Sequence, residues 1–163
     1  MNALGQDTNA ATYDSSPKLP PRVRQSSLDG DIEFLAARAR SVGNAAANGE
    51  LAPLDLKVRS YAVLALASTT DGPSQREIAE YLCLDPSRIV AIVDELEQRD
   101  LVRRTPDPRD RRTKVVRSTK SGQALYRLGA EAVRKAEEFS LRALSFDERN
   151  TLRELLRKIA FTE

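Results

Sequence analysis

The sequence predicts a mainly α-helical fold with one small β-hairpin. Apolar residues recur at helical spacing through most of the chain beyond residue 28, and two helix-capping patterns follow each other closely in its middle. Two short runs of β-forming residues come next, separated by a connection rich in proline and arginine. Two short helices followed by a basic hairpin, in this order, predict a winged helix-turn-helix, with further helices on both sides of it.

Capping patterns place the two helices of the expected helix-turn-helix. Ser74 and Glu77 have the spacing of a capping box, so the first helix should begin at Ser74. Asp85 and Pro86 supply an N-cap residue and a proline at the first helical position, which should start the second helix. Each pattern alone is common, and an ordinary helical hairpin with a solvated charged face would show both. The apolar residues that should form the shared core are Ile78, Leu82, Ile89, Ile92, Val93 and Leu96.

The expected hairpin is far more basic than the chain as a whole. Residues 99–120 contain nine Arg and Lys against three Asp, a local charge of +6, whereas the whole chain carries +2. The strand candidates and the prolines that keep their connection out of a helix are Leu101-Val102, Pro106, Pro108 and Val115-Val116. Because neutralising phosphates supplies much of DNA affinity, this cluster favours a DNA-contacting wing over a hairpin whose charge is merely solvated.

Several short motifs resemble the MarR family of transcriptional regulators. They are Tyr61-Ala62-Val63-Leu64, Gln75-Arg76-Glu77-Ile78-Ala79, Asp85-Pro86-Ser87, Val93-Asp94-Glu95-Leu96-Glu97, Leu101-Val102-Arg103-Arg104, Asp107-Pro108-Arg109-Asp110-Arg111-Arg112 and Thr119-Lys120-Ser121-Gly122. The resemblance covers residues 29–161, and its most specific element is the Asp-Pro-x-Asp-Arg-Arg of the wing. It implies an obligate homodimer, one winged helix-turn-helix in each subunit and often a small-molecule effector.

The chain departs from the family pattern at four positions. Cys83 and Asp100 stand where relatives usually have glycine, and Asp tolerates the left-handed backbone expected at a helix C-terminus better than most residues. Ser118 replaces a leucine just before the next helix. Ala91 stands where relatives often carry an arginine that touches DNA, so this position should not read a base directly. This last change does not threaten the fold.

The resemblance and the local sequence together assign the expected DNA contacts. We expect Arg112 to enter the minor groove, oriented by a charge-assisted hydrogen bond that it donates to Asp110. Arg88 could read a guanine, or it could pair only with a phosphate or with Asp85. The expected contacts to bases and phosphates are Ser74, Gln75, Ser87, Arg88, Arg109, Asp110, Arg111 and Arg112.

The resemblance also implies an effector pocket between the dimer helices and the winged module. An arginine in such a pocket can hold an aromatic carboxylate through a bidentate pair, which makes Arg38, Arg59 and Tyr61 candidates. The alternative is two solvated arginines and a core tyrosine. Cys83 lies in the helix-turn-helix turn, whereas oxidant-sensing relatives carry their thiol near the start of the first helix, so we expect a packed cysteine.

The chain should consist of a tail and one domain. Residues 1–27 are rich in Asn, Ser, Thr, Pro and Gly and predict a disordered tail; residues 28–163 form the domain. Its DNA-binding module spans about 55–118, including a helix over 56–68, and dimerisation helices span about 29–48 and 119–161. Gly43 and Gly49 should interrupt or end the first of these, while Thr119 and Ser145 should each begin a helix. The apolar stripes of the flanking helices could fold back on their own module, but the resemblance favours an isologous dimer.

Composition narrows the function further. The 163 residues contain no apolar run near the length of a membrane span, no basic-then-apolar leader, one Cys and no His. We therefore expect a cytoplasmic protein without a histidine-based metal site or catalytic triad, without a cofactor, and without enzyme activity. The predicted function is a repressor that binds inverted-repeat double-stranded DNA as a homodimer and is released by an acidic aromatic or phenolic ligand. The alternatives are a protein-interaction module and a DNA-binding regulator without an effector.

Overall fold

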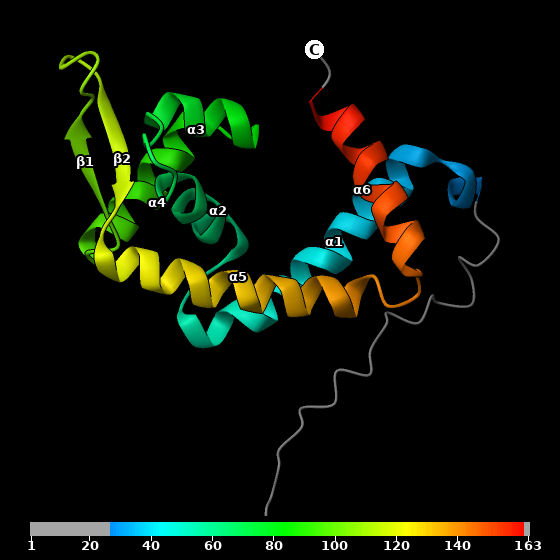
Figure 1. The fold of residues 1–163 in the computed structure, drawn as a ribbon. Coiled ribbons are helices and arrows are strands. Elements are labelled where there is room, and N and C mark those ends of the chain that lie inside the picture. Colours follow the sequence, from blue (N-terminus) through cyan, green and yellow to red (C-terminus); the bar gives the residue numbers. More distant parts are fainter. Residues whose placement is uncertain (1–26, 162–163) are drawn as a thin grey trace, which may run out of the picture. The chain divides into compact units, whose positions relative to one another are not determined.

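The computed structural model describes residues 27–161 (Figure 1). The chain divides into two compact units, residues 1–37 and residues 38–163, which we describe separately. The described part of the first unit consists of the short helix η2 (Ser27–Gly30) and the beginning of α1 (Ile32–Leu51). The tail expected over residues 1–27 lies outside the described residues, apart from Ser27 in η2.

The second unit contains the rest of α1, the predicted helix-turn-helix and the hairpin. In chain order its other elements are η3 (Ala52–Leu54), α2 (Val58–Ala67), α3 (Gln75–Leu82), α4 (Pro86–Gln98), β1 (Val102–Pro106), β2 (Lys114–Ser118), α5 (Lys120–Ser140) and α6 (Phe146–Ala160). The predicted fold class, mainly α with a β-hairpin wing, is confirmed. No helix within residues 27–161 is long and apolar enough to cross a membrane.

The first long helix differs from the prediction at its C-terminal end. α1 runs through both Gly43 and Gly49 and ends only at Leu51. A glycine inside a helix costs roughly 1 kcal/mol relative to alanine, which neighbouring helix formers can offset. The helix ends instead where Pro53 enters η3, because proline has no N–H to donate and its ring clashes with the preceding turn.

The core lies where α2, α3, α4 and the hairpin meet. Ile78 of α3 and Ile89, Val93 and Leu96 of α4 are buried as predicted, while Leu82 and Ile92 are only partly buried. These side chains pack in one cluster with Val63 and Leu64 of α2 and with Val102 and Val116 of the hairpin. The helix pair and the wing therefore share a single core and are held together as one body.

The hairpin is also tied to the start of α3. β1 and β2 pair antiparallel, with Val102 opposite Ser118 and Pro106 opposite Lys114. On the other side of β2, the Val116 N–H donates to the Pro73 carbonyl at 2.8 Å, and Ser74 forms an isolated bridge with Val115. This pairing fixes the N-terminus of α3 beside the wing.

The two C-terminal helices begin where the sequence predicts. Thr119 caps α5 by accepting the Gly122 N–H, and Ser145 caps α6 in a reciprocal capping box with Glu148. α5 starts at the foot of β2 and runs away from the hairpin (Figure 1). Within the described residues no side chain of α6 is buried, and its large apolar side chains Leu155, Leu156 and Ile159 are exposed.

Candidate nucleic-acid interface

Both helices of the helix-turn-helix start with a side-chain cap. The Ser74 hydroxyl accepts the Glu77 N–H at 3.2 Å, and the Glu77 carboxylate accepts the Ser74 N–H at 2.7 Å. Asp85 accepts the Ser87 N–H at 2.8 Å and also the Ser87 hydroxyl. The Ser74 N–H lowers the pKa of Glu77, and the Ser87 hydroxyl lowers the pKa of Asp85. These hydrogen bonds fix the start of α4, and its N-cap residue, Asp85, carries a negative charge.

Cys83 and Asp100 adopt the left-handed backbone that the family pattern implies. Their φ angles are 50° and 52°, the region that favours glycine. Cys83 is the C-cap of α3, and Asp100 follows Arg99, the C-cap of α4. The expectation of a packed thiol is wrong: the Cys83 side chain is exposed, because the turn lies outside the core shared by α3 and α4.

Arg104 of β1 connects the wing to both helices. Its guanidinium donates to the Gln75 side-chain oxygen at 2.7 Å, to Asp94 at 2.5 Å and to Glu97. Its backbone N–H donates to Glu97 at 2.9 Å, and this hydrogen bond lowers the pKa of Glu97. One arginine of β1 thus contacts the first residue of α3 and the C-terminal half of α4. The wing is held in a fixed position relative to α4.

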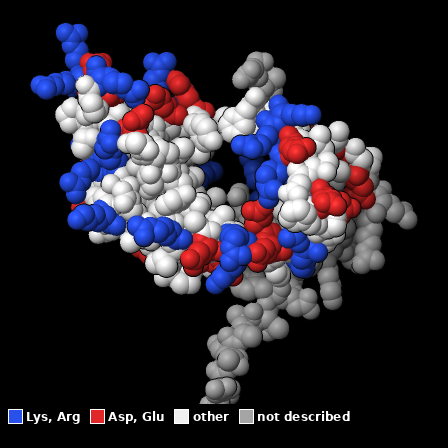
Figure 2. Space-filling view, viewed as in Figure 1, with Lys and Arg blue, Asp and Glu red and all other residues white. Residues whose placement is uncertain are grey.

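The wing tip is held by its own aspartates. Asp110 accepts the Arg112 N–H at 3.0 Å and the Thr113 hydroxyl at 3.0 Å, and Asp107 accepts the Arg109 N–H at 2.8 Å. These contacts stabilise the turn of the hairpin. The side chains of Arg109, Arg111 and Arg112 are exposed, with the Arg109 guanidinium 3.6 Å from Asp107, and Figure 2 shows basic side chains gathered at this end of the molecule.

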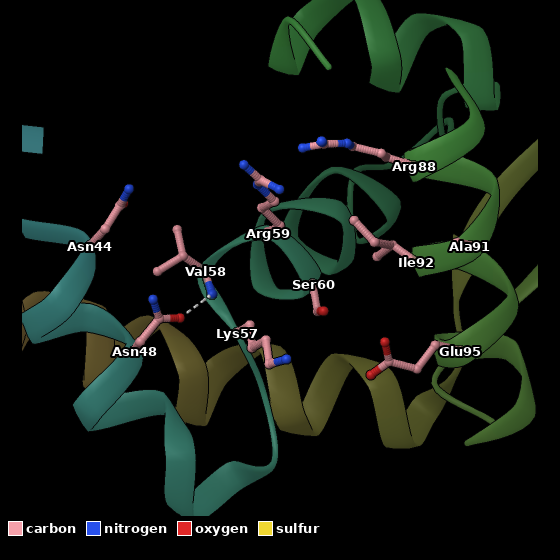
Figure 3. A pocket seen from close by; sticks show the side chains of 10 residues that line it. All are labelled: Asn44, Asn48, Lys57, Val58, Arg59, Ser60, Arg88, Ala91, Ile92 and Glu95. Carbon is pink, nitrogen blue, oxygen red and sulfur yellow. Dashed lines mark hydrogen bonds between the residues drawn. The ribbon is translucent and has the colours of Figure 1, made fainter. Parts of the chain in front are cut away.

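A pocket of about 580 Å³ opens beside α4, on the face that carries Arg88, Ala91 and Glu95 (Figure 3). Its lining residues come from the second half of α1, the start of α2 and α4: Asn44, Asn48, Lys57, Val58, Arg59, Ser60, Arg88, Ala91, Ile92 and Glu95. Three of them are basic and only Glu95 is acidic. Asn48 fixes one wall by accepting the Val58 N–H at 3.0 Å.

Comparison with known proteins decides the family. The MarR family model matches residues 56–114. The chain is 40% identical to CouR from Rhodococcus jostii RHA1 bound to p-coumaroyl-CoA, with a TM-score of 0.78 over 85% of this chain and 97% of that one. It is equally similar, at 40% identity and a TM-score of 0.80, to a MarR family transcriptional regulator from Rhodococcus sp. RHA1, over 85% of this chain and 98% of that one.

The chain belongs to the MarR family. It is also 36% identical over 107 residues to the HTH-type transcriptional repressor NicR of Pseudomonas putida. This match covers 64% of this chain and 68% of NicR. A MarR chain with this helix pair and wing is a DNA-binding transcriptional regulator.

Within this MarR fold, several of the expected DNA contacts already have intramolecular partners. The Ser74 hydroxyl donates to Glu77 and the Ser87 hydroxyl donates to Asp85. The Gln75 oxygen accepts from Arg104, and within residues 27–161 its NH₂ group has no hydrogen-bond acceptor, so it could donate to a phosphate. Arg109, Arg111 and Arg112 are exposed at the wing tip.

Asp110 contacts Arg112 in a different way from the predicted one. Its carboxylate holds the Arg112 backbone N–H and the Thr113 hydroxyl, not the Arg112 guanidinium. The local charge of +6 also overstates the positive charge available to DNA. Arg104 is paired with Asp94 and Glu97, and Arg99 lies 3.5 Å from Asp55.

Only one of the three predicted effector residues reaches the pocket. Arg59 lines it, whereas Arg38 is half-buried on α1 and does not. Tyr61 stacks on Tyr126 of α5 with ring centroids 6.0 Å apart, and burial raises its pKa. Residues two apart on a helix point to nearly opposite sides, so Arg59 and Tyr61 could not share one pocket. The pocket instead brings Arg88 next to Arg59.

Sequence reasoning missed Lys57 in the pocket, Arg104 as the link between wing and helices, and Val90. Val90 is 40% exposed, and it borders an apolar groove between α3 and α4 together with Gln75. Exposed apolar residues early in α4 were a signal for Val90, and the Asp94-x-x-Glu97 spacing was a signal for Arg104, because residues three apart share a helix face.

Proposed function

We propose that a homodimer of this chain represses transcription by binding an inverted repeat in double-stranded DNA, and that an anionic aromatic ligand releases it. The observation that carries the DNA-binding part is the connection through Arg104. A fixed wing beside α4 allows α4 to enter the major groove while Arg112 reaches the adjacent minor groove. Ser74 and Gln75 would contact phosphates, and Ser87 and Arg88 would face base edges.

The dimer is supported by the terminal helices. α6 buries none of its described side chains in this subunit, and Leu155, Leu156 and Ile159 are exposed along it. An isologous interface would cover this apolar face and place two copies of α4 about one helical turn apart on DNA. The role is binding and not catalysis, and we place it in the cytoplasm, where a regulator of this kind meets its operator.

The ligand part rests on the basic pocket. Lys57, Arg59 and Arg88 line a cavity whose volume is in the range of small-molecule sites. CouR, at 40% identity, was crystallised with p-coumaroyl-CoA, which joins an aromatic acid to a phosphate-bearing carrier. We infer that the ligand of this chain belongs to the same chemical class, the aromatic acids and their coenzyme A thioesters. Any such ligand must bind the free protein more tightly than the DNA-bound protein.

Footprinting on the DNA around its own gene, combined with light scattering, tests the proposal. We expect a dimer that protects two half-sites about 10 base pairs apart, centre to centre. Affinity should fall linearly with salt on logarithmic axes, because phosphate contacts release counterions. A monomer that binds a single half-site equally well would contradict the dimeric model. Salt-independent binding would favour a protein-interaction module.

The ligand part has its own test. p-Coumarate, p-aminosalicylate and p-coumaroyl-CoA are added to the protein–DNA complex in a shift assay. Release at or below about millimolar concentration, the weak end of useful affinity, supports a ligand switch. If none of the three releases the protein, the ligand switch is dropped and the DNA-binding role stands alone.

A further inference from the structure

Arg88 lies where two surfaces of the protein meet. It belongs to the first turn of α4, the end of the helix that the proposed function directs toward base edges. The same side chain also lines the basic pocket. Figure 3 shows the Arg88 and Arg59 guanidinium groups extending toward the same open space. A single guanidinium therefore stands within reach of two binding sites.

The basic side chains of this pocket are weakly compensated. Lys57, Arg59 and Arg88 form no side-chain hydrogen bond or ion pair with any residue in 27–161, although Asp85 interacts with Arg88 electrostatically. Glu95, the only acid in the lining, lies 3.8 Å from Arg99 and shares its charge with that residue. A cleft lined by one sign of charge concentrates the opposite sign. The charge of the pocket therefore favours binding of an anion.

We propose that Arg88 is shared between ligand and DNA. Together with Arg59 and Lys57 it holds a phosphate-bearing group in the pocket, and while it does so it cannot contact the operator. Phosphate fits better than a lone carboxylate, because two arginines and Lys57 line the same pocket, and a doubly charged group with three oxygens can use more of these donors than a carboxylate can. This inference rests on the proposed function and assigns its switch to one residue.

The sharing has a mechanistic consequence. Ligand and DNA become competitive because each uses the same donor group, and the bound phosphate adds negative charge beside the DNA backbone. Release then needs no change in the spacing of the two copies of α4. The coupling is reciprocal, so DNA must weaken phosphate binding as much as phosphate weakens DNA binding. Removing Arg88 should reduce both affinities and also their coupling.

The first experiment measures binding to the free protein without DNA. Inorganic pyrophosphate and p-coumaroyl-CoA are titrated calorimetrically into wild type, Arg59→Ala, Arg88→Ala and the control Arg127→Ala, an exposed arginine of α5 outside the pocket. We expect Arg59→Ala and Arg88→Ala each to weaken binding about tenfold, as for loss of a charge-assisted hydrogen bond, and the control to match wild type. Unchanged probe affinity in Arg88→Ala overturns the inference. So does the absence of binding by both probes.

The second experiment separates competition from a change of helix spacing. Operator complexes are prepared at low salt, where the weakened Arg88→Ala complex remains measurable, and the probe is raised to saturation. If Arg88 is shared, saturating p-coumaroyl-CoA dissociates the wild type at least tenfold more effectively than it dissociates Arg88→Ala. Equal dissociation of the two complexes overturns the sharing and assigns release to spacing. A wild type that binds no operator contradicts the proposed function instead, and the calorimetry without DNA still decides whether Arg88 holds the probe.

Discussion

At the base of the wing, Arg104 is surrounded by Gln75, Asp94 and Glu97, and its side chain is 20% exposed. At the tip, Arg112 is exposed, and among the described residues it makes only one hydrogen bond, from its backbone N–H to Asp110. The same residue type in one hairpin therefore serves two purposes. The base uses arginine charge to join the wing to α3 and α4, and the tip leaves arginine charge available to a partner.

The base is also the more closely packed end. The Thr119 N–H donates to the Leu101 carbonyl at 3.0 Å, and the Thr119 hydroxyl donates to the Asp100 carbonyl at 2.6 Å. Gly122 of α5 lies against the same carbonyl of Leu101. Substitutions at the base should therefore change stability first, whereas substitutions at the tip should change DNA affinity alone.

Gly122→Ala should have the largest effect. A Cβ atom there would lie 1.9 Å from the Leu101 carbonyl oxygen, which belongs to backbone and cannot rotate away. We expect the free energy of unfolding to fall by about 3 kcal/mol, the upper end for overpacking, despite alanine's better helix propensity. Urea unfolding followed by circular dichroism measures this.

Gly43→Ala is the matched control for that substitution. Gly43 also lies inside a helix, but a Cβ there would meet nothing within 4 Å. It should therefore raise stability by up to about 1 kcal/mol through helix propensity and a stiffer unfolded chain. Equal effects of Gly122→Ala and Gly43→Ala on stability would contradict the close approach of Gly122 to the Leu101 carbonyl.

Arg104→Ala should come next. It leaves Asp94 and Glu97 facing each other without a cation and removes the donor to Gln75. We expect a loss of about 2 kcal/mol in the free energy of unfolding, together with weaker DNA binding because the wing is no longer fixed. A double-mutant cycle with Asp94→Ala should show a coupling energy well above zero. Additive effects would mean that the two side chains act independently.

The capping chemistry could be predicted because it is local. Ser74, Asp85, Thr119 and Ser145 each start a helix as expected, since a cap depends on residues two or three positions away. The core of α3 and α4 was predictable for a similar reason, because helical spacing decides which side faces inward.

Contacts between distant elements could not be predicted in the same way. Arg104 and Gln75 are 29 residues apart. The Asp94-x-x-Glu97 spacing indicates an acidic helix face, but only the fold shows that Arg104 lies between that face and Gln75. Helical spacing alone places Arg59 and Tyr61 on nearly opposite sides of α2, which is incompatible with the prediction that both line one effector pocket. The family resemblance supplied the wing motif, whereas the pocket that joins Arg59 to Arg88 depends on how α2 and α4 pack.

Arg112→Ala should affect DNA binding without affecting stability. The exposed side chain has no ion pair within residues 27–161, so unfolding should change by less than about 0.5 kcal/mol. Operator affinity should fall by at least fivefold, since a minor-groove arginine contributes about 1 kcal/mol or more. Fluorescence anisotropy with labelled operator measures it, and light scattering checks the dimer. A loss below about threefold would remove Arg112 from the interface.

The smallest effect concerns pH at the base of the wing. The Arg104 N–H holds the pKa of Glu97 below its ordinary value of about 4.3, so this contact stabilises the folded state above that pH. The contribution is lost as pH falls from there through the lowered pKa. Glu97→Gln should therefore cost less than about 1 kcal/mol at pH 7, because the side chain is partly exposed, and the difference from wild type should shrink toward pH 3.

Thermal unfolding of both proteins across that pH range tests the sign and the size of the effect. The acid destabilisation that remains in Glu97→Gln comes from other carboxylates with lowered pKa, such as Glu77 and Asp85, whose hydrogen-bond partners lie outside the Arg104 cluster. An Arg104→Ala background removes the guanidinium contact of Glu97 but keeps the backbone N–H that lowers its pKa most, so the Glu97→Gln difference should become smaller there and should still shrink in acid. A difference that grows in acid would show that Glu97 stabilises the wing through some other contact.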